Sequence, residues 1–151
     1  MVKPSFTFGL SEDAKAIREE VFVKEQGFQK EFDELDAKSW HLVLYLDNTP
    51  IATGRVSEVD PETYRIGRVA VKKEFRHMKV GSYTIKFLCN KVLSLGARKA
   101  ILSAQSDKIG FYRALGFRPV PDGEITYDEG VPHLTMYKIL IRGKKSYRPF
   151  Y

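Results

Sequence analysis

The sequence predicts a mixed-sheet α/β or α+β domain with helices on both faces of the sheet. With 151 residues, the chain has room for one domain with a core of its own. Its hydrophobic content of 43% and aromatic content of 13% are those of a folded protein rather than a disordered one. Short apolar segments typical of strands alternate along the chain with segments that carry apolar residues at helical spacing.

The chain is expected to begin with a strand and a helix. The strand is expected over residues 6–8. Ser11 is a suitable N-cap, because its hydroxyl can accept a hydrogen bond from the first helical turn, and two acidic residues follow it. Ile17 and Val21 then carry the buried stripe of a helix that ends before Gly27.

Residues 41–71 predict three antiparallel strands. The segments 41–46 and 51–56 are joined by the polar segment 47–50, which predicts a hairpin with a four-residue turn. The third strand is expected over residues 64–71, after a second polar turn.

The second half of the chain predicts a long helix, a buried strand, a short helix and final strands. Apolar residues recur at three- and four-residue spacing over residues 85–95, and Gly96 closes this helix. Residues 99–104 form a nearly continuous apolar run, typical of a strand covered on both faces. A short helix over 109–115 and a strand over 133–141 follow.

Composition excludes several classes of protein. No apolar run approaches the roughly 20 residues that a membrane span needs, and the first residues lack the pattern of a signal peptide, so we expect a cytoplasmic protein. The single cysteine, Cys89, cannot form an internal disulfide. Three scattered histidines do not form a metal-ligand cluster, and no metal is predicted.

The net charge of +6 is unevenly distributed. Residues 11–36 hold nine Asp or Glu against four Lys or Arg. Five basic residues and no acid lie near the carboxyl end: Lys138, Arg142, Lys144, Lys145 and Arg148. The two features fit a site for a cationic partner and a site for an anionic one, or solvated surfaces. We divide the chain into a domain of residues 1–140 and a basic tail of residues 141–151.

The stretch "FRHMKVGSYTIKFL", residues 75–88, suggests an anion site. The first N–H groups of a helix have no intrahelical acceptors, and the helix dipole adds partial positive charge there. Arg76, His77 and Lys79 surround this helix start, and Gly81 allows a close backbone approach. Ordinary solvating charges on a surface turn would look similar.

Two motifs in register resemble the GCN5-related N-acetyltransferase (GNAT) family. The segment "GRVAVKKEFRHMKVGSYTIKFL" is similar to the family's coenzyme A signature, Arg/Gln-x-x-Gly-x-Gly/Ala after a hydrophobic strand. Arg76 and Gly81 occupy its outer positions, and Lys79 replaces the first glycine. About thirty residues later, "AQSDKIGFYRALGF" resembles the family's strand and short helix with Phe-Tyr and Gly-Phe.

Three further segments resemble the ElaA/YjcF-like subgroup of this family: "EEVFVKEQGF", "SWHLVLY" and "DEGVPHLTM". The resemblance covers residues 20–137. It implies the GNAT fold, a mixed and mostly antiparallel sheet in which one strand splays from its neighbour at a bulge. It also implies direct transfer of an acetyl group from acetyl-coenzyme A to a primary amine. For an enzyme of this small size, a homodimer is a possible assembly.

The resemblance assigns a set of cofactor contacts. The splayed strand is expected to pair with the pantetheine arm, and the diphosphate is expected on the amides before and within the helix start. The implied residues are Val69, Ala70, Val71, Arg76, His77, Met78, Lys79, Val80, Gly81, Ser82, Gln105 and Phe111. For Phe111, packing in the core is the alternative.

The resemblance also places Tyr112 near the thioester sulfur as a proton donor. For the general base, Glu25 and His133 rank highest because they fall in subgroup motifs; each has a structural alternative, helix capping for Glu25 and loop anchoring for His133. The substrate-binding candidates are His41, Arg55 and Glu129. His41 is alternatively a core residue, Glu129 part of a polar turn, and Arg55 the partner of a nearby carboxylate.

Two other functions fit parts of the sequence. The domain is alternatively an acyl-coenzyme A binding module with little turnover. The basic tail, with Tyr147, Phe150 and Tyr151 available for stacking, is alternatively a nucleic-acid binder, although no nucleic-acid motif accompanies it.

Overall fold

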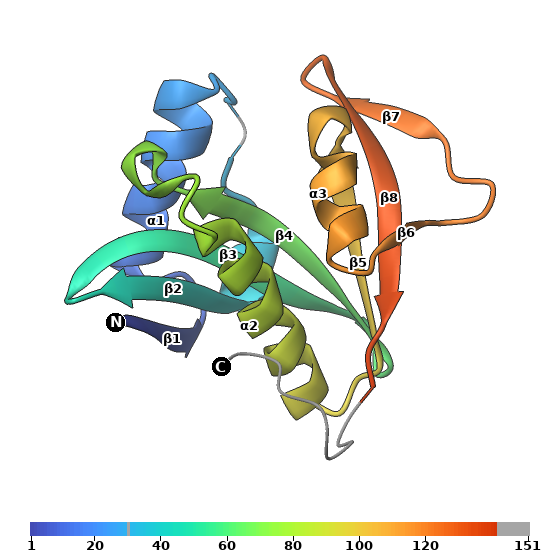
Figure 1. The fold of residues 1–151 in the computed structure, drawn as a ribbon, viewed down its shortest axis with the longest axis horizontal. Coiled ribbons are helices and arrows are strands. Elements are labelled where there is room, and N and C mark those ends of the chain that lie inside the picture. Colours follow the sequence, from blue (N-terminus) through green and yellow to red (C-terminus); the bar gives the residue numbers. More distant parts are fainter. Residues whose placement is uncertain (30, 142–151) are drawn as a thin grey trace.

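The computed structural model describes residues 1–29 and 31–141. Over these ranges the strands form one sheet in the order β1-β2-β3-β4-β5-β8-β6, with β7 paired to β8 (Figure 1). The strands are β1 (Val2–Phe8), β2 (Trp40–Leu46), β3 (Thr49–Asp60), β4 (Thr63–Val71), β5 (Lys99–Gln105), β6 (Arg118–Pro119), β7 (Ile125–Asp128) and β8 (Val131–Ile139). The helical elements are α1 (Glu12–Arg18), α2 (Val80–Ser94), α3 (Ile109–Ala114), the π-helix η1 (Glu19–Glu25) and the 3-10 helices η2 (Glu34–Lys38), η3 (Lys73–Phe75) and η4 (Ser106–Lys108).

The predicted mixed sheet is confirmed, because β4 and β5 run parallel and the other paired strands run antiparallel. The predicted hairpin turn was too long. Asp47 and Asn48 adopt φ values of 48° and 80°, which suit a two-residue turn whose twist matches that of the strands. Thr49 and Pro50 therefore belong to β3. The sequence pattern did not predict where β6 and β7 begin and end.

The first helix changes geometry along its length. Ser11 is its N-cap, as predicted, with Oγ accepting from the amide of Ala14 at 3.2 Å. After Arg18 the backbone continues as the π-helix η1, and Gln26 N donates to Val21 O five residues back at 3.0 Å. Such π segments are frequent at functional sites, because they shift the direction of the side chains that follow.

Helices cover both faces of the sheet, as predicted (Figure 1). Side chains alternate along a strand, so consecutive residues of β2 reach different cores. Val43 packs with Ile17 of α1, whereas Leu42 and Leu44 belong to the cluster that includes Leu88 of α2. A Cβ on Gly54 would lie 2.5 Å from a methyl carbon of Leu88, so this glycine permits the close approach of α2 to β3.

The sheet opens between β4 and β5. Thr53 pairs with Ala70 and Arg55 with Gly67, so β4 carries an extra residue at a bulge, where Arg68 has a φ of 53°. Strand β4 pairs with β5 only through residues 63–66. Beyond this point β5 continues its pairing with β8 alone, and the end of β4 is left without a neighbour on that side. The predicted splayed strand is confirmed.

Candidate active site

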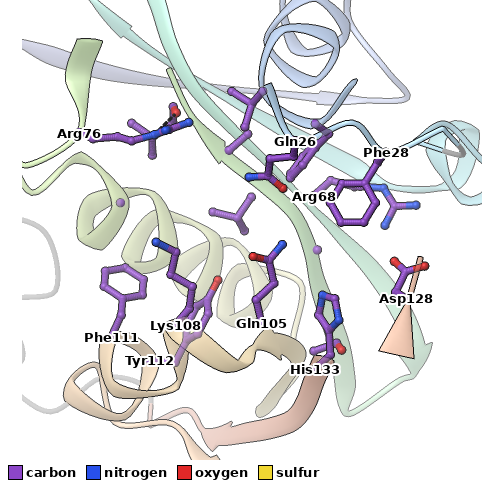
Figure 2. A pocket seen from close by; sticks show the side chains of 18 of the residues that line it. Gln26, Phe28, Arg68, Arg76, Gln105, Lys108, Phe111, Tyr112, Asp128 and His133 are labelled. Carbon is purple, nitrogen blue, oxygen red and sulfur yellow. Dashed lines mark hydrogen bonds between the residues drawn. The ribbon is translucent and has the colours of Figure 1, made fainter. Parts of the chain in front are cut away.

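A cavity of about 610 Å³ lies where β4 and β5 separate, and its two ends differ chemically (Figure 2). The start of α2, with Arg76, His77 and residues 79–82, lines one end, here termed the amide end. The other end, termed the carboxylate end, is lined by Glu31, Asp128 and Glu129 together with Arg68 and His133. The wall between them includes Val69, Ala70, Val71, Ser103, Gln105, Lys108, Phe111 and Tyr112.

The amide end presents backbone N–H groups. Lys79 is the N-cap of α2 and provides no side-chain cap, so the amides of the first turn remain available to a ligand. The left-handed residues of this loop are His77 and Lys79, with φ values of 70° and 62°, rather than Gly81. A Cβ on Gly81 would lie 3.4 Å from the ring of Phe111, so a side chain here would fill the space between the start of α2 and this ring.

Arg76 lines the amide end, but its side chain is already engaged. Its guanidinium donates to both carboxylate oxygens of Glu25, at 2.5 and 2.8 Å, and Nε donates to Val71 O at 3.0 Å. These bonds lower the pKa of Glu25, which weakens Glu25 as a proton acceptor. Met78, predicted as a cofactor contact, is 56% exposed and its side chain is outside the cavity lining.

Tyr112 lies in the wall of the cavity, as the prediction for it requires (Figure 2). Its ring packs edge-on against Phe111 and Phe117, with centroids 5.0 and 5.9 Å apart. Burial raises the pKa of the Tyr112 phenol to about 12, so the hydroxyl is protonated at neutral pH. Phe111 therefore both packs in the core and lines the cavity.

His133 reaches the cavity from β8 on the carboxylate side (Figure 2). Its Nδ1 lies 2.8 Å from the carbonyl oxygen of Val131. Since a carbonyl can only accept, Nδ1 carries the proton, and in the neutral ring Nε2 keeps its lone pair. The side chain is 9% exposed. Loop anchoring and the role of a base are thus compatible.

A buried ionic network supports the carboxylate end. Arg18, 1% exposed, donates Nε to Glu31 Oε2 at 2.9 Å and Nη1 to Asp36 Oδ1 at 2.7 Å. Arg68, from the bulge of β4, donates Nε to Glu31 O at 2.9 Å and Nη2 to Asp33 at 3.1 Å. Burial raises the pKa of Glu31, against the opposing effect of the neighbouring guanidinium groups.

Two predicted substrate contacts belong to this network and not to the cavity lining. Arg55 binds Asp33 at 2.7 Å and Asp36 at 2.8 Å, which is the carboxylate pairing considered as its alternative. His41 is 1% exposed and bonds through Nε2 to Asp36 O at 2.9 Å, and burial lowers its pKa. Both predictions of substrate contact are therefore corrected: burial and internal bonds withhold these side chains from a ligand in the cavity.

Glu129 does line the cavity, and its carboxylate accepts from Gln29 N at 3.1 and 3.2 Å. Sequence reasoning missed other lining residues: Gln26, Phe28, Glu31, Arg68, Ser103, Lys108, Thr126 and Asp128. The acidic excess over residues 11–36 was a signal for Glu31. No local pattern marks Arg68, because the bulge alone directs it to this site.

Comparison with known proteins identifies the family. The chain matches the Acetyltransferase (GNAT) family over residues 9–117. YjcF of Bacillus subtilis, named an N-acetyltransferase, is 38% identical over 128 residues, which cover 83% of this chain and 90% of YjcF. ElaA of Escherichia coli is 30% identical over 128 residues, which cover 81% of this chain and 82% of ElaA. A solved structure from Lactobacillus plantarum has a TM-score of 0.84 at 26% identity, over 93% of this chain and 99% of that one.

The chain therefore belongs to the Acetyltransferase (GNAT) family and is an acyl-coenzyme A dependent N-acyltransferase. The resemblance to YjcF and ElaA confirms the subgroup predicted from the three short segments.

Proposed function

We propose that the protein transfers the acetyl group of acetyl-coenzyme A directly to a primary amine bound at the carboxylate end. The supporting observation is that Tyr112 and His133 line one cavity at the opening between β4 and β5. A thioester in this opening would have a phenol on one side and an imidazole on the other.

The cofactor would lie along the amide end and the free side of β4. The backbone groups of Val69 to Val71 that face away from β3, apart from the Val71 carbonyl that accepts from Arg76, would bond the pantetheine arm as an added strand does. The diphosphate would accept hydrogen bonds from the amides of Val80, Gly81 and Ser82, with Lys79 adding positive charge. Gln105 and Phe111 would border the acyl group.

The reaction needs a neutral amine and a stabilised leaving group. The amine nitrogen attacks the thioester carbonyl, its proton passes to Nε2 of His133, and the C–S bond then breaks. Tyr112 donates a hydrogen bond to the departing sulfur. A phenol with a pKa of about 12 holds its proton more tightly than a thiol of ordinary pKa about 8.5. Tyr112 therefore stabilises the negative charge of the thiolate through a hydrogen bond and keeps its own proton. Solvent supplies the thiolate with its proton.

The test is an amine-library screen with acetyl-coenzyme A, read by thiol release, on wild type and on His133→Gln. The proposal expects amine-dependent release by wild type and a marked loss of kcat in the variant. Cofactor binding without release by any amine would favour the acyl-coenzyme A binding module. Absence of cofactor binding would contradict both.

Other predictions remain to be tested by separate experiments. In the described part of the chain, the helices are all too short or too polar to cross a membrane. Cytoplasmic location and a homodimer stay predictions. The domain limits and a nucleic-acid role for the basic tail also stay predictions, because the tail beyond Ile141 lies outside the described residues.

A further inference from the structure

Glu25 and Arg76, 51 residues apart in the sequence, form an ion pair beside the cavity. Both Nη atoms of Arg76 donate to the two oxygens of Glu25, and Nε donates to Val71 O. A bidentate pair fixes the orientation of both groups, unlike a single contact. Three of the five N–H donors of this guanidinium group thus have acceptors within the protein.

The pair connects three segments that border the cavity: the end of η1, the loop before α2 and the end of β4. Glu25 is the last residue of η1, and the next residue, Gln26, lines the cavity with its amide directed inward (Figure 2). Arg76 immediately precedes the loop of left-handed residues that leads into α2. Val71 is the last residue of β4, the strand expected to hold the pantetheine arm.

The same geometry argues against two simpler roles. Arg76 stabilises the ionised form of Glu25, which makes Glu25 a poor general base. A guanidinium held by a carboxylate and a carbonyl is also a poor ligand for a diphosphate, whereas Lys79 and Lys108 line the cavity and carry positive charge.

We propose that Glu25 is a positioning residue, which holds Arg76 against the end of β4 and thereby keeps the amide end at a fixed place relative to η1 and Gln26. The inference rests on the proposed function. It assigns Glu25 an effect on cofactor affinity without contact with the cofactor, and it makes Gln26 a contact for the acyl group or the acceptor.

The expected effect is modest, because the two side chains are 32% and 34% exposed and solvent screens the pair. We expect Glu25→Gln to raise the dissociation constant of coenzyme A about two- to fivefold. Arg76→Gln should raise it by a similar factor, and the double variant should be no worse than Arg76→Gln, because the two residues act as one unit.

The experiment is calorimetric titration of coenzyme A into wild type, the two single variants and the double variant, with melting temperatures measured in parallel. Glu124→Gln is the matched control, because it removes one carboxylate from an exposed position outside the cavity lining. The pH profile of kcat is recorded for Glu25→Gln, and its shape should match that of wild type.

The outcomes separate the alternatives. Unchanged binding by Glu25→Gln would overturn the proposal, because the pair would then have no effect on the cofactor site. Tighter binding would also overturn it, because it would mean that Glu25 competes with the diphosphate for Arg76. Loss of the acidic limb of the profile, the fall of kcat at low pH, would overturn it in favour of a general base. Wild type that binds no coenzyme A would instead overturn the proposed function, so the two failures are distinguishable.

Discussion

The two ends of the cavity are built in different ways. The amide end comes from one continuous segment, residues 76–82, and uses backbone groups whose direction is set by the start of α2. The carboxylate end combines residues from the loop after η1, the bulge of β4 and the β7–β8 hairpin. The amide end is a local structure, formed by a loop and the helix that follows it. The other exists only after the sheet has assembled.

Their electrostatics differ as well. At the amide end, charge is offered to an anionic ligand by the helix start and by Lys79. Next to the carboxylate end, the charges are balanced within the protein, since Arg18, Arg55 and Arg68 face Glu31, Asp33 and Asp36. This network fixes the loop after η1 against the sheet, so that Glu31 and Phe28 line a formed wall. The comparison shows that the amide end depends on a turn, and the carboxylate end on a buried ionic network.

Arg18→Met should have the largest effect, because it removes the most buried guanidinium of the network and leaves Asp36 paired with Arg55 alone and Glu31 with Arg68 alone. Breaking a buried pair by removing one partner costs about 3–5 kcal/mol of unfolding free energy. Urea denaturation measures the loss. Lys15→Met, which removes a cation from an exposed position of the same helix, is the control and should change stability little. Equal stability of Arg18→Met and wild type would show that the network is not what holds this end.

Tyr112→Phe tests the wall between the two ends. Removing one donor to a developing charge lowers kcat about 10²-fold, so we expect a loss of this order with little change in coenzyme A affinity. Steady-state kinetics and calorimetry measure the two quantities. Tyr83→Phe, an exposed tyrosine of α2, is the control. Turnover equal to that of wild type would refute the role given to Tyr112.

The pH dependence of stability isolates the network. Burial raises the pKa of Asp36, but the hydrogen bonds from Arg18, from the Asp33 amide and from Arg55 outweigh burial and lower it to about 2. A depressed pKa gives stability that is present above the unfolded value of about 3.9 and is lost as the pH falls toward 2. As the pH is lowered from about 5 to about 2, the melting temperature of wild type should fall more steeply than that of Asp36→Asn. Parallel curves would contradict the assignment.

Lys79→Gly gives the smallest expected effect and addresses the amide end alone. Glycine accepts the left-handed φ of 62° without the penalty of about 1 kcal/mol that a side chain carries, but it also loses more entropy on folding. The melting temperature should therefore change little. At low salt, the variant should bind coenzyme A about two- to fivefold more weakly than wild type. This difference should shrink at high salt, because screening weakens the contact of Lys79 in wild type. Lys86→Gln, exposed on α2, is the control; equal affinities at low salt would deny Lys79 a phosphate contact.

The same contrast explains what could be predicted from the sequence. The order of strands and helices and the position of the amide end follow from apolar spacing and from the basic loop before α2, which are local signals. The left-handed residues were not predictable, because His77 and Lys79 adopt conformations that sequence preference assigns to glycine. The two-residue turn at Asp47 and Asn48 was not predicted for a different reason, because the polar segment 47–50 indicates a longer turn.

The carboxylate end was largely unpredictable because its members meet only through tertiary contacts. Arg55 and His41 were candidates for substrate contact, with a carboxylate partner and a core position as their alternatives, and each is bonded to Asp36 of η2. Glu25 was predicted as a general base from its motif, which gave no sign of its partner Arg76. His133 was predicted, and the structure adds the bond to Val131 that defines which nitrogen holds the proton.

Amide hydrogen exchange with and without acetyl-coenzyme A tests the central claim most directly. We predict that the cofactor slows exchange in two segments, residues 69–71 at the end of β4 and residues 79–82 at the start of α2, because the N–H groups there that have no partner in the protein become donors to the ligand. Protection confined to other segments, or the same exchange with and without saturating cofactor, would contradict it.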